Sequence, residues 1–491
     1  MASVAYKAMM WIATFATLLG GFQYGYALGI MNTMLDYVGE DLSFDVTLSG
    51  AIIGSAVLLG AAAGAVAGGH FADRLGTKRA QIYNTFIFVI GGVMCSCSPP
   101  TGLSCLGMKI PLVLLLGRLV VGFASGASSL YTPRLLAEIS PPHLRGLFGA
   151  SFQILLNVGI LASYVIGLPY ESTPGARVQV FNMDVAWWRV MFACGIAPAV
   201  VQWFLLLVVP ESPVWLDWKG DFAAADTSRR SFWTDMDEAG NSETKSDNTE
   251  PLLVESKKSS INNIELGLDI EAFVDAPLGS AALFERKYRW MVALAVGVPL
   301  LAQLSGINTV VFYSSQVFAT AGVKSPILGS IYTGLVNVIF TIVSSVMLDR
   351  YGRRPLLLWS HGGMCISILG LALASSSLAA GSWASSMALP LVLLYVMFFA
   401  MGAGPVPWIY LSEILPENIK GFVAGFATAQ CWIANLLIVL TFPSMLNAIH
   451  LFGSYVLYSG LNLVALLFAF SLVVETKQRS LRDIANKLLL K

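Results

Sequence analysis

Charged residues are scarce in this chain of 491 residues, and their scarcity excludes the soluble classes of protein. Lys, Arg, Asp and Glu make up 12% of the chain, whereas hydrophobic residues make up 56%. A soluble globular protein carries about 25% charged residues, so this composition indicates an integral membrane protein. The 29 basic and 29 acidic residues cancel, and nothing in this balance points to nucleic acid.

Histidine is rare and dispersed, and signatures of catalysis are missing. The four histidines are His70, His143, His361 and His450, and their wide spacing forms no metal-ligand cluster. No P-loop signature occurs, and no G-x-G-x-x-G sequence follows a predicted strand. We therefore expect neither an enzyme nor a bound cofactor or metal.

Cysteine is also sparse, and no cleavable secretory signal is evident. The first apolar run follows Lys7 and continues to Leu35, which is too long for a signal-peptide core. Three of the six cysteines, Cys95, Cys97 and Cys105, cluster at the end of the third apolar run. On an oxidising side of the membrane they allow one disulfide in three pairings, and free thiols are the alternative that the sequence leaves open.

Long uncharged runs take the place of the missing charges. Residues 355–412 hold 58 consecutive positions without Asp, Glu, Lys or Arg, and residues 421–474 hold 54. One membrane-spanning helix needs about 20 apolar residues, so each of these runs must contain two spans. The expected spans are 8–34, 46–70, 80–98, 110–136, 146–168, 188–209, 288–318, 325–348, 355–376, 386–411, 421–446 and 451–474.

Charge concentrates in one segment, between Asp217 and Arg286, which holds 22 of the 58 charged residues. Such a composition is typical of a solvated and partly disordered loop. We therefore expect a six-span unit at 1–212, a linker with short helices at 213–287, a second six-span unit at 288–474 and a tail at 475–491. The short loops "DRLGTKR" and "DRYGRR" are basic, so the positive-inside rule places both termini and the linker in the cytoplasm, with the plasma membrane as the expected location.

Three charged motifs recur in the same order in both halves of the chain. Asp73 in "ADRLG" is matched by Asp349 in "LDRYG" at an offset of 276, and Glu138 by Glu413 at an offset of 275. Glu211 in "PESP" is matched by Glu475 in "VETK" at an offset of 264. Such a repeat predicts two six-span halves of the same topology, related by an axis along the membrane normal. We expect ion pairs among these residues to hold one end closed until the halves rock, although ordinary membrane-flanking charge is the alternative. The charged-motif residues are Asp73, Arg74, Glu138, Arg145, Glu211, Asp349, Arg350, Arg353, Glu413, Lys420 and Glu475.

These residues, together with several other motifs, resemble the sugar porter family of the major facilitator superfamily. The matching motifs are "GRLVVG", "EISPPHLRG", "PESPVWL", "QLSGIN", "DRYGRR", "GPVPWIYLSEILP" and "VETK". The resemblance covers nearly the whole chain outside the linker. The resemblance implies an all-α integral membrane fold with twelve helices in two pseudo-symmetric bundles. It also implies a carrier for a monosaccharide such as glucose, with the sugar and the lipid bilayer as its partners and no obligate protein partner.

The stretch "AQLSGINTVVFYSS" places neutral amides and a glycine inside the predicted seventh span. Gly306 is expected to unwind this helix near the bilayer midplane, where broken helices of carriers bind substrate. The amides of Gln303 and Asn308 offer donors and acceptors to sugar hydroxyls without a charge, although hydrogen bonding between helices is the alternative. By similarity, the expected sugar-binding residues are Gln153, Gln303, Asn308, Asn337, Trp408, Trp432 and Asn435. The expected gate residues are Phe312, Tyr313, Pro405 and Pro407.

Departures from the family pattern bear on coupling and on the substrate. Proton-coupled members carry an aspartate at the position of Ala27, whereas its partner Arg118 remains here, so we predict facilitated, downhill transport. A proton-coupled symporter for a sugar, polyol or inositol, and a sugar sensor on a transporter fold, are the alternatives. The other departures are Val214, Ala302, Ala400, Lys420, Cys431 and Val474, of which Ala302, Ala400 and Cys431 leave the identity of the sugar open.

Overall fold

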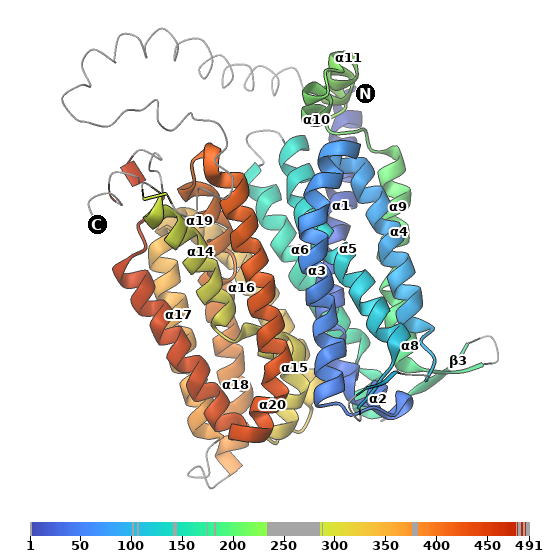
Figure 1. Cartoon of the computed structure of the whole chain (residues 1–491), viewed down its shortest axis with the longest axis vertical. Coiled ribbons are helices and arrows are strands. Elements are labelled where there is room, and N and C mark those ends of the chain that lie inside the picture. The colour runs from blue at the N-terminus through green and yellow to red at the C-terminus, as the bar shows by residue number, and fades with distance from the viewer. Residues whose placement is uncertain are drawn as a thin grey trace.

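The computed structural model shows two helical bundles packed side by side (Figure 1). It describes residues 2–100, 103–105, 108–140, 145–173, 175–180, 183–232, 285–286, 288–375, 382–477, 479, 483–484 and 487. Within this part of the chain, nine helices, some merged across a kink, are long and apolar enough to cross a membrane. The protein is a multi-pass integral membrane protein, as the composition predicts.

The first half of the chain forms one bundle and two short hairpins. Its helices are α1 (Ala2–Gly29), α2 (Met31–Leu42), α3 (Leu48–Leu75), α4 (Thr77–Ser96), α5 (Leu112–Ile139), α6 (Arg145–Ile166), α7 (Pro169–Ser172), α8 (Trp187–Cys194) and α9 (Ile196–Val208). The antiparallel hairpins pair β1 (Leu103–Cys105) with β2 (Met108–Ile110) and β3 (Arg177–Val180) with β4 (Met183–Ala186). The hydropathy pattern gave no sign of these hairpins.

The second half forms the other bundle. Its helices are α14 (Arg289–Leu304), α15 (Ile307–Thr320), α16 (Pro326–Tyr351), α17 (Arg353–Ala374), α18 (Ser382–Phe398), the π-helical turn η5 (Phe399–Ala403), α19 (Val406–Ile414) and α20 (Glu417–Ser471). The 55-residue α20 is interrupted at His450, which has φ 57° and ψ −179°, so it supplies two spans. All twelve predicted spans thus lie on helices.

Two short helices, α10 (Pro213–Trp218) and α11 (Phe222–Phe232), begin the predicted linker. Residues 233–284 and 287 lie outside the described part of the chain. Figure 1 shows α10, α11 and the N-terminus at one end of the bundles, whereas α2 and the β3–β4 hairpin lie at the other. We call these the α10–α11 end and the hairpin end.

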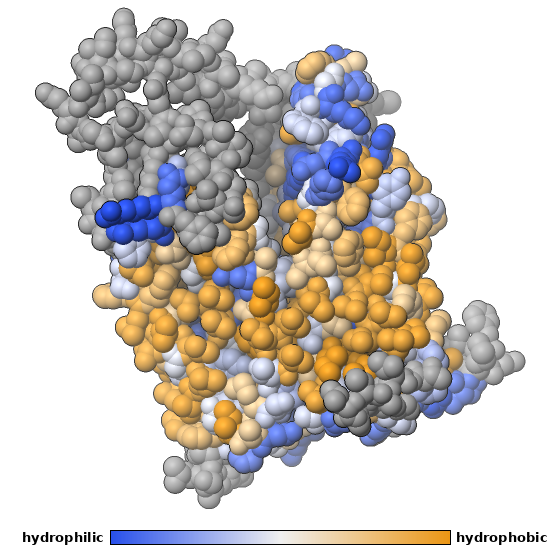
Figure 2. All heavy atoms as spheres, in the orientation of Figure 1, coloured by the Kyte–Doolittle hydropathy of each residue, from blue (hydrophilic) through white to orange (hydrophobic). Residues whose placement is uncertain are grey.

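Small residues let the helices of the first bundle approach closely. A Cβ atom on Gly126 of α5 would come within 1.9 Å of the carbonyl oxygen of Ala61 on α3, and one on Gly64 within 1.9 Å of the carbonyl of Phe123. Hydrophobic collapse does not hold helices together in lipid, so such backbone contact is a main source of attraction. Apolar residues instead face outward, where Figure 2 shows an apolar belt between two polar ends.

The cysteine cluster holds free thiols. Cys95 is buried and Cys97 is exposed, and neither forms a disulfide. Every pairing within the cluster needs one of these two residues, so the disulfide that the sequence left open is not formed in this structure. The side chain of Cys105 itself lies outside the described residues.

Candidate functional site

The seventh predicted span breaks at Gly306, as expected. α14 ends at Leu304 and α15 begins at Ile307, and Gly306 between them has φ +95°. A Cβ atom at this position would lie 2.8 Å from the ring of Tyr458, so both the backbone conformation and the close packing require glycine. The break turns the polar side chains on either side of it toward α20.

Three of the predicted sugar-binding amides meet beside this break. The side-chain amide of Asn308 donates to Oε1 of Gln303 at 3.2 Å and also to Oδ1 of Asn435 on α20. Asn308 is 8% exposed, so these hydrogen bonds lie away from bulk solvent. We call Gln303, Asn308 and Asn435 the first amide cluster.

A second amide cluster joins the two bundles. Asn157 of α6 donates to Oδ1 of Asn337 at 3.2 Å and to the hydroxyl of Thr341 at 2.8 Å, both on α16. Gln153, one turn earlier on α6, donates to Asn157 at 3.4 Å. Gln153 and Asn337 were predicted, but Asn157 between them and Thr341 were not. Their position four residues from a predicted amide on the same helix face was the available signal.

Aromatic residues follow two different patterns. Trp432 is 5% exposed, packs 5.7 Å from the ring of Tyr24 in the opposite bundle, and has a buried indole N–H without an acceptor among the described residues. Trp408 of α19 is 40% exposed, and no described hydrogen bond connects it with either cluster. A helix break precedes it, because η5 ends at Ala403 and α19 begins directly after Pro405.

The predicted gate residues Phe312 and Tyr313 are buried in α15. The Tyr313 hydroxyl donates to the carbonyl of Val439 at 2.8 Å, and its ring lies 5.6 Å from that of Phe442. Tyr313 departs from helical geometry with φ −136°, so α15 is irregular here as well. Of the gate prolines, Pro407 is buried and Pro405 is partly buried.

Hydrogen bonds join the bundles at the hairpin end. Asn32 of α2 donates to the hydroxyl of Ser314 at 2.9 Å and accepts from the backbone N–H of Ser315 at 3.1 Å. Nearby, the Tyr164 hydroxyl of α6 donates to the carbonyl of Val311 at 2.8 Å. Two further contacts are Gln316 with Asp36 at 3.0 Å and the N–H of Ile327 with Glu171 at 3.1 Å. This end is therefore closed, and α15 is the element that most of these contacts hold.

The charged-motif residues gather at the α10–α11 end. In the first bundle Arg134 of α5 lies 2.7 Å from Asp73 and 2.9 Å from Glu138. In the second bundle Arg353 makes two hydrogen bonds with Glu413, at 3.0 and 2.6 Å. Each described ion pair of this group lies within one bundle. Arg134 was not predicted, although it lies four residues before Glu138, an ion-pair spacing on one helix face.

Glu211 and Glu475 have matching structural roles. Glu211 accepts from the backbone N–H groups of Lys78 and Arg79 at the start of α4, at 2.9 and 3.3 Å. Glu475 accepts from the N–H groups of Arg353 and Arg354 at the start of α17, at 2.9 and 3.0 Å. Burial raises the pKa of Glu211, and the N–H groups oppose that rise. Both carboxylates cap a helix N-terminus.

The remaining charged-motif residues are either exposed or have side chains outside the described part of the chain. Arg74 and Arg350 are exposed, and the backbone carbonyl of Arg350 accepts from Lys477 at 2.8 Å. The side chains of Arg145, Asp349 and Lys420 lie outside the described residues. Their predicted ion pairs stay predictions.

Arg118 is fully buried in α5 and lies beside Ala27. Its guanidinium donates to the carbonyl oxygen of Ala27 at 2.8 Å and to that of Gly54 at 3.4 Å, while Nε has no acceptor among the described residues. Helix carbonyls therefore take the place of the aspartate that the sequence lacks. A buried cation with a spare donor is costly in a membrane interior.

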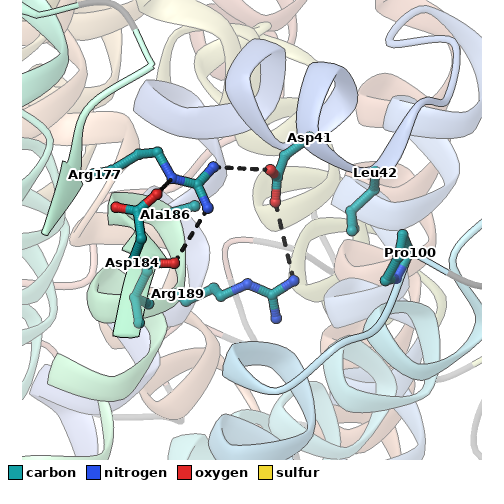
Figure 3. Close-up of a pocket in the computed structure, with 8 residues that line it drawn as sticks. Asp41, Leu42, Pro100, Arg177, Asp184, Ala186 and Arg189 are labelled. Atoms are coloured by element: carbon teal, nitrogen blue, oxygen red, sulfur yellow. Dashed lines mark hydrogen bonds and ion pairs between the residues drawn. The ribbon is translucent and has the colours of Figure 1, made fainter. Parts of the chain in front are cut away.

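A cavity of about 360 Å³ lies elsewhere, at the hairpin end of the first bundle (Figure 3). Arg177 on β3 contacts Asp184 at 2.5 Å and Asp41 at 3.5 Å, and Arg189 lies 3.9 Å from Asp41. The indole N–H of Trp188 also donates to Asp41 at 3.0 Å. Both carboxylates are thus engaged by groups of the protein, and the arrangement pins the β3–β4 hairpin to α2 and α8.

Comparison with known proteins identifies the family of this chain. A family model described as "Sugar (and other) transporter" matches residues 13–488. Plastidic glucose transporter 4 of Arabidopsis thaliana is 32% identical over 468 residues, covering 95% of this chain and 78% of the relative. Facilitated glucose transporter protein 1 of Caenorhabditis elegans is 31% identical over 491 residues, covering 96% and 89%.

A solved structure is similar over the same length. The xylose transporter XylE from E. coli, in a partially occluded inward open conformation, matches with a TM-score of 0.73 and 25% identity, covering 96% of this chain and all of that one. Family, relatives and fold therefore agree on a sugar transporter built from two helical bundles. This chain belongs to the sugar transporter family of the major facilitator superfamily, and it is a membrane carrier for a sugar.

Proposed function

We propose that the chain carries a hexose such as glucose down its concentration gradient, by alternating access between its two bundles. The observation that carries the proposal is the pair of uncharged amide clusters, one at the Gly306 break and one between α6 and α16. The names of two relatives, both glucose transporters and one a facilitated glucose transporter, support it.

The chemistry of the clusters suits an uncharged polyhydroxy ligand. Each hydroxyl of a sugar is both donor and acceptor, and a carboxamide offers both functions without a charge. In the first cluster Asn308, Gln303 and Asn435 bond to one another, so a sugar hydroxyl can replace one of these partners. The indole N–H of Trp432 supplies a buried donor, and its ring is suited to the apolar face of a sugar. We propose Gln153, Asn337 and Trp408 as further sugar contacts.

Transport without protons is supported by the surroundings of Arg118. Its described hydrogen bonds go to the carbonyls of Ala27 and Gly54. A backbone carbonyl does not titrate, so a proton has no carboxylate to bind at this position. Proton symport would need such a group or a substitute for it.

We further propose that the α10–α11 end faces the cytoplasm of a cell whose plasma membrane holds the carrier. The basic loops support this orientation. The closed hairpin end would then be external, and the structure would represent an inward-facing state, in line with the similar conformation of the xylose transporter. The charged motifs would engage the opposite bundle only in the outward-facing state.

Purified protein in liposomes tests the proposal directly. Labelled glucose should enter saturably with its own gradient, and collapsing a pH gradient at a fixed glucose gradient should leave the rate unchanged. A rate that follows the pH gradient would establish symport, and absence of saturable flux would favour a sensor. Competition by hexoses, pentoses and polyols then ranks the substrates, and stronger competition by a pentose or polyol would overturn the hexose assignment.

A further inference from the structure

The break at Gly306 leaves a backbone carbonyl that the helix itself does not satisfy. In a continuous helix the carbonyl of Ser305 would accept from the N–H of Thr309, but that N–H bonds to Gly306 at 2.9 Å. Ser305 is fully buried, so its carbonyl needs another donor. Two side chains supply one each: the Tyr395 hydroxyl of α18 at 3.1 Å and the Asn462 amide of α20 at 2.9 Å.

The orientation of Asn462 is fixed by its own hydrogen bonds. One N–H donates to Ser305 and the other to the carbonyl of Tyr458 at 2.9 Å, so both amide hydrogens are used. Its Oδ1 therefore faces Nδ1 of His361 at 3.4 Å. Only a donor can face that oxygen, so the proton of the neutral imidazole lies on Nδ1. His361 of α17 thereby fixes the amide that satisfies the broken helix.

The neighbouring residue on α17 supports the second helix break of this bundle. The hydroxyl of Ser360 accepts from the backbone N–H of Ala403, the last residue of η5, at 2.9 Å. A Cβ atom on Gly402 would lie 2.4 Å from the carbonyl of Leu356, so η5 packs directly on the α17 backbone. π-helical turns of this kind are common at functional sites.

We propose that Ser360 and His361 are positioning residues that hold both broken helices of the second bundle on one rigid support, α17. His361 acts through Asn462 on the Ser305–Gly306 break, and so on Gln303 and Asn308. Ser360 acts on the η5–α19 break, and so on Trp408. The inference rests on the proposed role of the first amide cluster in binding sugar. On this proposal, Ser360 and His361 influence sugar affinity although neither residue contacts the sugar.

Two substitutions at position 361 separate positioning from mere packing. His361→Leu keeps an apolar side chain of similar size but removes the donor, and it should weaken binding of labelled glucose about tenfold, by the loss of one buried hydrogen-bond network. His361→Asn places an amide N–H near the position of Nδ1 and should restore binding to within about twofold. Failure of the asparagine to restore binding, or wild-type affinity in the leucine variant, would overturn the proposal.

Asn84→Leu is the matched control in the other bundle. Asn84 is a buried asparagine whose amide donates to the carbonyl of Ala124 and the hydroxyl of Ser128, both at 2.9 Å, within one half. Its loss should lower Tm to a similar extent and leave glucose affinity unchanged. An equal loss of affinity in Asn84→Leu would show that general destabilisation explains the effect.

Two further variants keep the inference testable on its own. If His361→Leu does not fold, Ser360→Ala removes the hydrogen bond to η5 with a smaller change in side-chain volume. It should raise the KM of influx severalfold with only a modest fall in Tm; an unchanged KM counts against the inference. Asn308→Ala tests the proposed site itself. Wild-type glucose binding by Asn308→Ala would reject the proposed site. Weak binding by Asn308→Ala together with wild-type binding by His361→Leu would reject only the positioning role of His361.

Discussion

At the residue scale, the site consists of neutral amides whose partners come from distant parts of the chain. Asn308 bonds to Asn435 across 127 residues, and Asn157 bonds to Asn337 across 180. These amides satisfy one another in the absence of a ligand, so a bound sugar has to exchange hydrogen bonds rather than create them. Affinity then depends on small differences between good hydrogen bonds.

Replacing Asn308 by alanine should weaken glucose binding about tenfold, because about 1.4 kcal/mol is lost with a buried hydrogen bond to the ligand. Equilibrium binding of labelled glucose to purified protein measures the change. Ser345→Ala is a suitable control, since the Ser345 hydroxyl donates only to the carbonyl of Ile342 in its own helix. An unaltered dissociation constant for Asn308→Ala would remove this residue from the site.

Ala27→Asp should make transport depend on pH. The new carboxylate would lie beside the buried guanidinium of Arg118, which already contacts the backbone of residue 27 at 2.8 Å. Charge pairing favours the ionised aspartate, and sugar-dependent changes in its surroundings can then bind and release a proton. Glucose uptake at several pH values measures this, with Ala27→Asn as a control of equal size that does not titrate. Identical pH profiles for the two variants would contradict the expectation.

At the element scale, the second bundle depends on helices that are broken at defined points. Gly306 separates α14 from α15, and η5 with Pro405 separates α18 from α19. Each break frees backbone groups that side chains of neighbouring helices must satisfy, as Tyr395 and Asn462 do for Ser305. The sequence predicted the break at Gly306 because glycine acts locally on the backbone. It did not foretell which side chains would satisfy the freed backbone groups.

Gly306→Ala should destabilise the protein by about 2–4 kcal/mol, because alanine at positive φ and contact of its Cβ with Tyr458 both add strain. Sugar affinity should fall in parallel as Gln303 and Asn308 shift. Thermal unfolding in detergent and glucose binding measure the two effects. Gly425→Ala is the control, since a Cβ at this helical position meets no other atom within 4 Å. Equal stability of the two variants would argue against a strained break.

Within the charged motifs, Arg353 should matter more than Arg350. Arg353 holds Glu413 through two hydrogen bonds, whereas the Arg350 side chain is exposed. Arg353→Ala removes both guanidinium hydrogen bonds from the partly buried Glu413 carboxylate and should lower both the Tm and the transport rate. Arg350→Ala should change each of them only slightly. Thermal unfolding and initial rates in liposomes decide the point. A larger effect at Arg350 would indicate that this residue forms an ion pair in another conformational state of the carrier.

At the scale of the whole molecule, two similar bundles pack together through α3 with α20 and α6 with α16, and hydrogen bonds join them at the hairpin end. Asn32, Tyr164 and Glu171 of the first bundle contact α15 and the start of α16. The described ion pairs at the α10–α11 end stay within one bundle. A carrier of this design changes its open side by exchanging one set of contacts between bundles for another.

Asn32→Ala should favour opening of the hairpin end, since it removes the side-chain hydrogen bonds to Ser314 and Ser315. In a background without native cysteines, Val311→Cys behind these contacts should react severalfold faster with an impermeant maleimide added at that end. Thr33→Ala is the neighbouring control, because the buried Thr33 hydroxyl has no partner among the described residues. Equal labelling in both variants would show that Asn32 does not hold this end closed.

The sequence by itself determined the number and placement of the spans, the duplication, and the helix break at Gly306. Each of these follows from local properties, namely hydrophobicity over about 20 residues, a recurring motif, or a residue with unusual backbone freedom. It also selected most of the amides, because an uncharged polar side chain inside an apolar run is conspicuous. Only the tertiary structure decided which of them meet, which end of the molecule is closed, and that Arg134, Asn157 and Asn32 take part. Those outcomes depend on contacts between different helices, many of them more than 100 residues apart in the chain. The i, i+4 spacing marks Arg134 and Asn157 as neighbours of predicted residues, but it does not specify their partners on other helices.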